Sequence, residues 1–191
     1  MRYASIRTLD ISNGEDIGVS LFIQGCHQHC FNCFNPETWD FNGGKEWTDD
    51  VQKQFLSLVS NPYIKRVTIL GGEPLAYENL PEVYDLVDTI KKQYPDKKVW
   101  LYTGYTLSYG FNECGNLVGD FTNADIGWDN GLLRNHILRN CDIVVDGEYI
   151  DEQRDITLAF RGSRNQRVID VKESLDKKKI ILYETNELVG V

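Results

Sequence analysis

The sequence has no long run of apolar residues and no excess of basic ones. No stretch approaches the roughly 20 apolar residues that a membrane-spanning helix needs, and Met1–Ser5 contains no apolar core of a secretory signal. The chain has 20 Lys and Arg against 29 Asp and Glu, a net charge of -9. This balance argues against binding nucleic acid by neutralising its phosphates. We therefore expect a cytoplasmic protein that binds neither a membrane nor nucleic acid.

Cysteine is also scarce, and its distribution is uneven. The 191 residues include five cysteines, three of which lie within residues 26–33. Without a secretory signal, clustered cysteines indicate metal binding or catalysis in a reducing compartment, and not a disulfide framework. The hydrophobic content of 41% and the charged content of 26% are ordinary for a globular protein. The length predicts a single domain over residues 1–191.

Apolar residues alternate between strand-like and helix-like patterns along the chain. Strands are predicted at 19–24, 66–70, 99–102 and 143–145, with two further candidates at 168–171 and 180–183. Helices are predicted at 48–59, 78–93, 132–138 and 172–179. This alternation favours an α/β fold with a mainly parallel sheet. The number of units is too small for a closed eight-stranded barrel, so we expect a partial (β/α) barrel of about five to six strands.

Two further features of the sequence bear on the predicted arrangement of strands and helices. The segment 106–131 is rich in Gly, Asn and Asp and shows no clear period, so it is interpreted as a loop insertion. Most of the predicted strands end in a turn that contains glycine. In parallel α/β folds ligands bind at the carboxyl ends of the strands, which predicts that these turns share one functional face.

The strongest chemical signal is the spacing C-x3-C-x2-C of Cys26, Cys30 and Cys33, directly after the first predicted strand. Three thiolates can hold three irons of a [4Fe–4S] cluster, which would leave the fourth iron open to a ligand. Two other interpretations exist. The cysteines could form an apolar helical stripe, or they could bind zinc with His27 or His29 as a fourth ligand.

A second motif, Gly71-Gly72-Glu73-Pro74, ends the second predicted strand. Glycines let a backbone approach a ligand closely, and a carboxylate can pair with an ammonium group. On its own, the same motif is also typical of a plain turn before a helix.

Together the two motifs resemble the signature of the radical S-adenosylmethionine superfamily, and the predicted fold is then a partial barrel of the radical-SAM type. The resemblance implies that Cys26, Cys30 and Cys33 ligate the cluster and that S-adenosylmethionine binds its open iron. It implies that Gly71, Gly72 and Glu73 contact the methionyl amino group of the cofactor. Asn32, Cys33 and Phe34 are then expected beside the adenine or the cluster. Thr103 and Asp146 are expected at the ribose or the methionyl end. For Asp146, an Asp-Gly turn is an equally good interpretation.

A finer resemblance is to the family of activating enzymes of anaerobic ribonucleotide reductases. It rests on Cys33-Phe34-Asn35 followed by Thr38-Trp39-Asp40, and on the segments 100–105 (WLYTGY), 145–147 (VDG) and 160–166 (FRGSRNQ). Asn32, where relatives have glycine, and Arg164, where a small residue is common, depart from the family pattern. The resemblance implies that Arg161, Asn165 and Gln166 line the opening for the partner's glycine loop; a structural hydrogen-bonding role for them is an equally good interpretation.

The resemblance implies a reaction and two partners. An electron from a flavodoxin-type donor reduces the cluster, S-adenosylmethionine is cleaved, and a hydrogen atom is abstracted from a glycine of the large reductase subunit, leaving a glycyl radical. The alternatives are an activase of the pyruvate formate-lyase type, a small radical-SAM enzyme acting on a small molecule, and a zinc-binding module without turnover. The segment 106–131, which has no counterpart in the family motifs, is a hypothetical docking site for the reductase.

Overall fold

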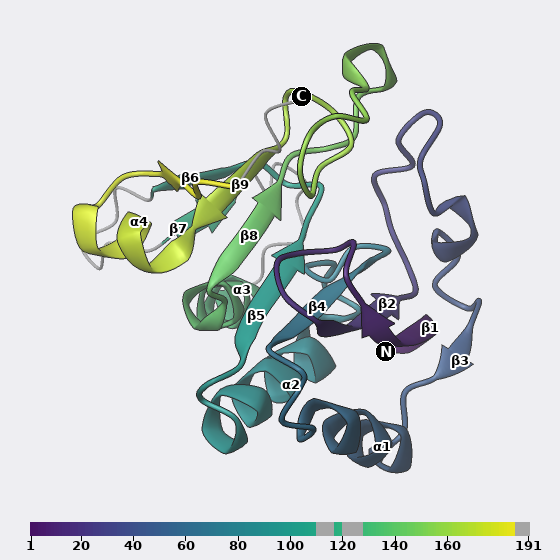
Figure 1. The fold of residues 1–191 in the computed structure, drawn as a ribbon. Helices are drawn as coiled ribbons and strands as arrows, with labels where there is room; N and C mark the ends of the chain where they lie inside the picture. Colours follow the sequence, from purple (N-terminus) through teal and green to yellow (C-terminus); the bar gives the residue numbers. More distant parts are fainter. Residues whose placement is uncertain (110–116, 120–127, 186–191) are drawn as a thin grey trace.

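The computed structural model describes residues 1–109, 117–119 and 128–185. Its main element is an eight-stranded mixed sheet, and the strand order is β10-β9-β8-β5-β4-β2-β1-β3 (Figure 1). The strands are β1 (Arg2–Asp10), β2 (Gly18–Ile23), β3 (Lys45–Glu46), β4 (Arg66–Gly71), β5 (Lys98–Tyr102), β8 (Ile143–Asp146), β9 (Arg167–Asp170) and β10 (Ile181–Leu182).

The centre of the sheet is parallel. Strand β4 pairs in parallel with both β2 and β5, and β5 pairs in parallel with β8. The register places Gly18 opposite Arg66 and Trp100 opposite Ile143. The outer pairs β1 with β2, β1 with β3, β8 with β9 and β9 with β10 are antiparallel. Because the four central strands run the same way, their carboxyl ends and the turns that follow them lie at one end of the sheet (Figure 1).

Helices cover one face of this sheet. They are α1 (Asp49–Val59), α2 (Leu80–Gln93), α3 (Trp128–Asn140) and α4 (Val171–Lys177), and two short 3-10 helices, η1 (Pro36–Thr38) and η2 (Asp151–Gln153), lie in the loops. Helix α1 begins at an N-cap, Thr48, whose hydroxyl accepts a hydrogen bond from the N–H of Val51. Helix α2 buries five apolar residues at helical spacing: Leu80, Val83, Leu86, Val87 and Ile90.

Alternation along the strands divides the sheet into two faces. Val19, Leu21 and Ile23 of β2 join the main core beneath the helices, together with the corresponding residues of the neighbouring strands. The intervening residues face the other way. There Trp100 and Val145 belong to a second, smaller cluster that packs against loop residues and not against helices. The face without helices therefore remains available for a site. No helix of the described residues is long and apolar enough to cross a membrane.

The structure agrees with the four predicted parallel strands and extends the map elsewhere. The two strands β1 and β3 were not predicted, and β9 and β10 join the sheet antiparallel to their neighbours. Within the predicted loop insertion 106–131, β6 (Leu107–Tyr109) and β7 (Leu117–Gly119) form a separate two-stranded sheet, and α3 begins at Trp128. Residues 110–116 and 120–127 of that insertion lie outside the described residues. The partial barrel itself stays a prediction.

A buried arginine anchors the segment that crosses the helix-free face. The Arg66 side chain is completely buried at the start of β4. Its guanidinium donates to the carbonyls of Glu15 (2.8 Å), Asn13 (3.0 Å) and Asp10 (2.9 Å) and to the hydroxyl of Thr68. One side chain thus fixes the turn between β1 and β2, because nearly all of its donors are used.

We expect Arg66→Leu to lower the free energy of unfolding by about 3–5 kcal/mol, because the buried Asp10 carboxylate loses its counter-charge and the carbonyls of Asp10 and Glu15 lose their donor. Urea denaturation measures this change. The control is Lys53→Ala, which removes an exposed pair with Asp50 and should change stability by less than about 0.5 kcal/mol. Equal effects from the two variants would contradict the anchoring role.

Candidate functional site

The cysteine loop, residues 25–35, is closed at its base by backbone hydrogen bonds. The N–H of Gly25 donates to the carbonyl of Thr38 (2.7 Å), and the N–H of Cys26 donates to the carbonyl of Trp39 (3.1 Å). Gly25 has φ +96, and a Cβ there would lie 2.1 Å from the Phe41 ring. This position therefore requires glycine.

The glycine turn that follows β4 packs directly on the base of the cysteine loop. The N–H of Gly72 donates to the carbonyl of Ile23 (2.8 Å), and the N–H of Glu73 donates to the carbonyl of Gly25 (2.7 Å). A Cβ on Gly72 would lie 2.3 Å from the Gly25 oxygen. The glycine at this position is thus needed for the contact between the two loops.

Glu73 is buried, with 1% of its surface exposed, and its carboxylate connects two strand ends. Oε1 accepts hydrogen bonds from the N–H of Leu75 (2.8 Å) and the hydroxyl of Thr103 (2.9 Å), and Oε2 accepts one from the N–H of Gly104 (2.7 Å). Burial raises the pKa of Glu73 to about 7, although these hydrogen bonds and the charge of Arg134 act in the opposite direction. The carboxylate joins the turn after β4 to the turn after β5.

A cavity of about 520 Å³ lies where these loops meet, a volume within the range of small-molecule sites. All three clustered cysteines line it, and each is partly exposed. The predicted residues Phe34, Gly71, Gly72, Glu73 and Thr103 also line it. The walls include apolar and aromatic side chains from β2, β4, β5 and the loop before β9, namely Phe22, Leu70, Tyr102 and Phe160.

The chemistry of the donors fits a bound metal cluster. Burial, followed by the charge of Glu73, raises the pKa of the Cys26 thiol to about 12, and burial raises the pKa of the Cys30 thiol. Without a cation these thiols would stay protonated, whereas coordination to a metal deprotonates a thiol outright. Among the described residues no three His, Cys, Asp or Glu side chains are arranged for a single ion. A cluster spreads its thiolate ligands over several irons.

Comparison with known proteins identifies the family. The chain matches the model of the 4Fe-4S single cluster domain over residues 12–169. It is 33% identical over 168 residues to the anaerobic ribonucleoside-triphosphate reductase-activating protein of Vibrio cholerae, covering 87% of this chain and 96% of that protein. The proteins of the same name from Escherichia coli K12 and Enterobacteria phage T4 are 31% and 32% identical, each over 88% of this chain and over 97% and 93% of their own lengths. The chain belongs to this family of activating proteins.

Two of the residues that the family resemblance assigned to the cofactor, Asp146 and Asn32, do not line this cavity. The Asp146 carboxylate is completely buried. It forms an ion pair with Arg167 and accepts a hydrogen bond from the N–H of Leu107 (2.7 Å). Asn32 is exposed and donates from Nδ2 to Asp151 Oδ2 (2.9 Å). Neither residue is among those that line the cavity.

The histidines considered as zinc ligands have other contacts. The His27 Nε2 lies 2.9 Å from Glu78 Oε1, and its ring packs on Phe41 with centroids 4.5 Å apart. The His29 ring stacks on Trp39 at 4.7 Å. Neither imidazole lines the cavity that the cysteines share.

Sequence reasoning missed two residues that hold the glycine turn in place. The buried Asn79 donates from Nδ2 to the carbonyls of Gln24 (3.2 Å) and Glu73 (3.0 Å). Arg134 of α3 is also buried and donates from Nε to the carbonyl of Leu75 (2.9 Å). The signal for Asn79 was its place before Leu80-Pro81 at the start of a helix. The sequence around Arg134 contains no such signal, because its partner Leu75 is 59 residues away.

We expect Thr103→Val to lower the free energy of unfolding by about 1–3 kcal/mol, because it removes a buried donor to Glu73 and leaves the N–H of Tyr105 without its acceptor. Thr103→Ser is the matched control, since it keeps the hydroxyl. Urea denaturation of both variants tests the prediction. A serine variant as unstable as the valine variant would assign the loss to the methyl group and not to the hydrogen bonds.

Proposed function

We propose that this chain activates an anaerobic ribonucleoside-triphosphate reductase, that Cys26, Cys30 and Cys33 hold its [4Fe–4S] cluster, and that S-adenosylmethionine binds beside that cluster. One observation carries the proposal. The three cysteines of a single loop share a cavity with the glycine turn Gly71–Glu73, and the chain belongs to a family of activating proteins that carry a 4Fe-4S domain.

When bound, the cluster and S-adenosylmethionine would supply reductive cleavage of the sulfonium C–S bond and, through it, hydrogen-atom abstraction from a glycine of the reductase. The protein contributes binding, orientation and exclusion of water. Three cysteines leave one position of a four-iron cluster for a ligand that the protein does not supply.

Glu73 is suited to bind a cationic ligand group. A carboxylate offers about four acceptor positions, and the hydrogen bonds from Leu75, Thr103 and Gly104 use three of them. The remaining position, on Oε2, suits the methionyl ammonium group of S-adenosylmethionine, since Glu73 lines the cavity together with Gly71 and Gly72. Thr103 then acts by orienting the carboxylate.

The helix-free face of the sheet would shield the reaction. Phe22, Leu70 and Tyr102 present apolar surface to the cavity from three neighbouring strands, and Phe34 stands at its rim with 56% of its surface exposed. Apolar walls exclude water, which limits side reactions of a reactive intermediate. A glycine-bearing segment of the reductase would have to reach this cavity, and we propose that a flavodoxin-type protein supplies the electron in the cytoplasm.

The test is anaerobic reconstitution with iron and sulfide, reduction, and measurement of 5′-deoxyadenosine formed from S-adenosylmethionine. We expect product from the wild type and a loss of about 10²-fold or more in the Cys26→Ala, Cys30→Ala and Cys33→Ala variants, because each lacks a ligand of the cluster. Adding the reductase should then give a glycyl radical detectable by electron paramagnetic resonance.

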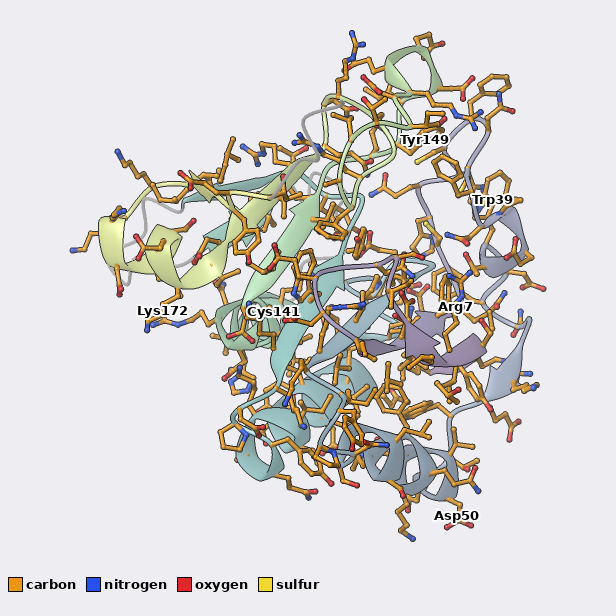
Figure 2. All side chains as sticks on the ribbon, in the orientation of Figure 1. Arg7, Trp39, Asp50, Cys141, Tyr149 and Lys172 are labelled. Atoms are coloured by element: carbon orange, nitrogen blue, oxygen red, sulfur yellow. The ribbon has the colours of Figure 1, made fainter. Side chains whose placement is uncertain are left out.

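Cys141→Ala is the matched control. Cys141 is buried (Figure 2) and precedes the amino end of β8, and it does not line the cavity, so its loss should leave cluster content and product unchanged. A wild-type protein that binds one zinc ion and no cluster would overturn the proposal. Product without a radical on the reductase would point to a different glycyl protein or to a small-molecule substrate.

A further inference from the structure

The segment 147–166, between β8 and β9, lies against the cysteine loop although the two are more than 100 residues apart in the sequence (Figure 1). Asn32 donates from Nδ2 to Asp151 Oδ2 at 2.9 Å. The Phe34 and Tyr149 rings pack with centroids 4.9 Å apart. In Figure 2, Tyr149 lies at the same end of the molecule as Trp39, which follows the cysteine loop. The functional roles described so far use none of these contacts.

Asp151 uses both of its carboxylate oxygens, one for the bond to the cysteine loop and one within its own segment. Oδ2 accepts the bond from Asn32, and Oδ1 accepts a hydrogen bond of 2.6 Å from the Tyr149 hydroxyl. Asn32 has φ +54, a left-handed conformation that glycine adopts more readily than other residues. Its amide side chain makes a bond across the two segments that glycine could not make.

The backbone around Tyr149 is fixed by the motif at 160–166. Asn165 donates from Nδ2 to the carbonyl of Glu148 (2.8 Å), and Gln166 donates from Nε2 to the carbonyl of Gly147 (2.9 Å). The N–H of Ile150 donates to the hydroxyl of Ser163 (3.2 Å). These three side chains hold the chain on both sides of Tyr149, which gives the motif a structural purpose.

Asn32 and Phe34 flank Cys33, so their contacts with the segment 147–166 hold the cysteine loop on both sides of that cysteine. Within the loop, the N–H of Asn35 donates a hydrogen bond to the Cys33 sulfur (3.4 Å). Hydrogen bonds to the sulfurs and exposure to solvent are among the factors that set the reduction potential of an iron–sulfur cluster. A donor favours the more negatively charged, reduced form and therefore raises the potential. Groups that fix the ligands of a metal commonly change its affinity as well.

We infer that Asn32, Asp151 and Tyr149 form a positioning clasp that holds the cysteine loop on both sides of Cys33 and keeps the Asn35 N–H on the Cys33 sulfur, so that the clasp sets the potential and the stability of the cluster. The inference rests on the proposed function in one respect, that Cys33 is a cluster ligand. None of the three side chains is a catalytic residue. The Asn35 backbone N–H contacts the ligand, and the three side chains act by holding the loop around it.

The experiment measures two properties of the reconstituted protein, the midpoint potential of the cluster and the rate at which the cluster is lost in air. Asp151→Ala should shift the potential to a more negative value. It should also speed cluster loss about two- to tenfold, the factor that corresponds to a hydrogen bond of about 0.5–1.5 kcal/mol. Asn32→Gly and Tyr149→Phe should give smaller shifts of the same sign, since each keeps part of the clasp.

The control is Glu152→Ala, which removes an exposed acidic side chain next to Asp151 and should change neither property. The double variant Asn32→Gly/Asp151→Ala should behave like Asp151→Ala alone, because both changes break the same bond. Circular dichroism and iron content show that each variant is folded and loaded.

Wild-type potential and wild-type air stability in Asp151→Ala and Asn32→Gly would overturn the clasp while leaving the proposed function intact. A wild-type protein that takes up no cluster would instead overturn the proposed function, and the clasp with it. Equal shifts in Glu152→Ala and Asp151→Ala would also contradict the inference, because they would assign the effect to charge alone.

Discussion

The site depends on one backbone contact, the approach of the glycine turn after β4 to the base of the cysteine loop. The carbonyl of Gly25 accepts the N–H of Glu73 at 2.7 Å, and no Cβ could be placed on Gly72 without a shift of one loop. The two motifs are therefore one structural unit. Glycine here brings two loops together, because only a residue without Cβ lets one backbone lie against the other at this position.

This unit is supported from three separate parts of the chain. Asn79 joins it to the start of α2, Arg134 of α3 holds the carbonyl of Leu75, and Thr103 and Gly104 after β5 bind the Glu73 carboxylate. The cysteine loop is also held at its other side by the segment 147–166. The family match over residues 12–169 spans all of these supports, which is expected if the cluster site requires every one of them.

The parallel strands and the carboxyl-end location of the motifs could be predicted from sequence, because buried strands and glycine turns leave local patterns. The strand β1 could not, because Arg2–Asp10 is mostly half-buried or exposed and has no simple alternation. The antiparallel direction of β9 could also be predicted from the sequence. No helix is predicted between β8 and β9, and a parallel pair needs a crossover connection, usually a helix. The Asn32–Asp151 contact, across 119 residues, leaves no local pattern.

Asp146 and Glu73 show why side-chain roles were harder to predict than positions. Both are buried carboxylates at the ends of parallel strands. Asp146 is paired with Arg167, which compensates its charge and leaves it a structural role. Glu73 accepts hydrogen bonds from the neutral groups of Leu75, Thr103 and Gly104, and burial raises its pKa to about 7 although the charge of Arg134 acts in the opposite direction. A cationic ligand group would stabilise its ionised form. The two carboxylates therefore differ in that Asp146 has a directly paired cation, and a sequence does not show such a pair when the partner is distant.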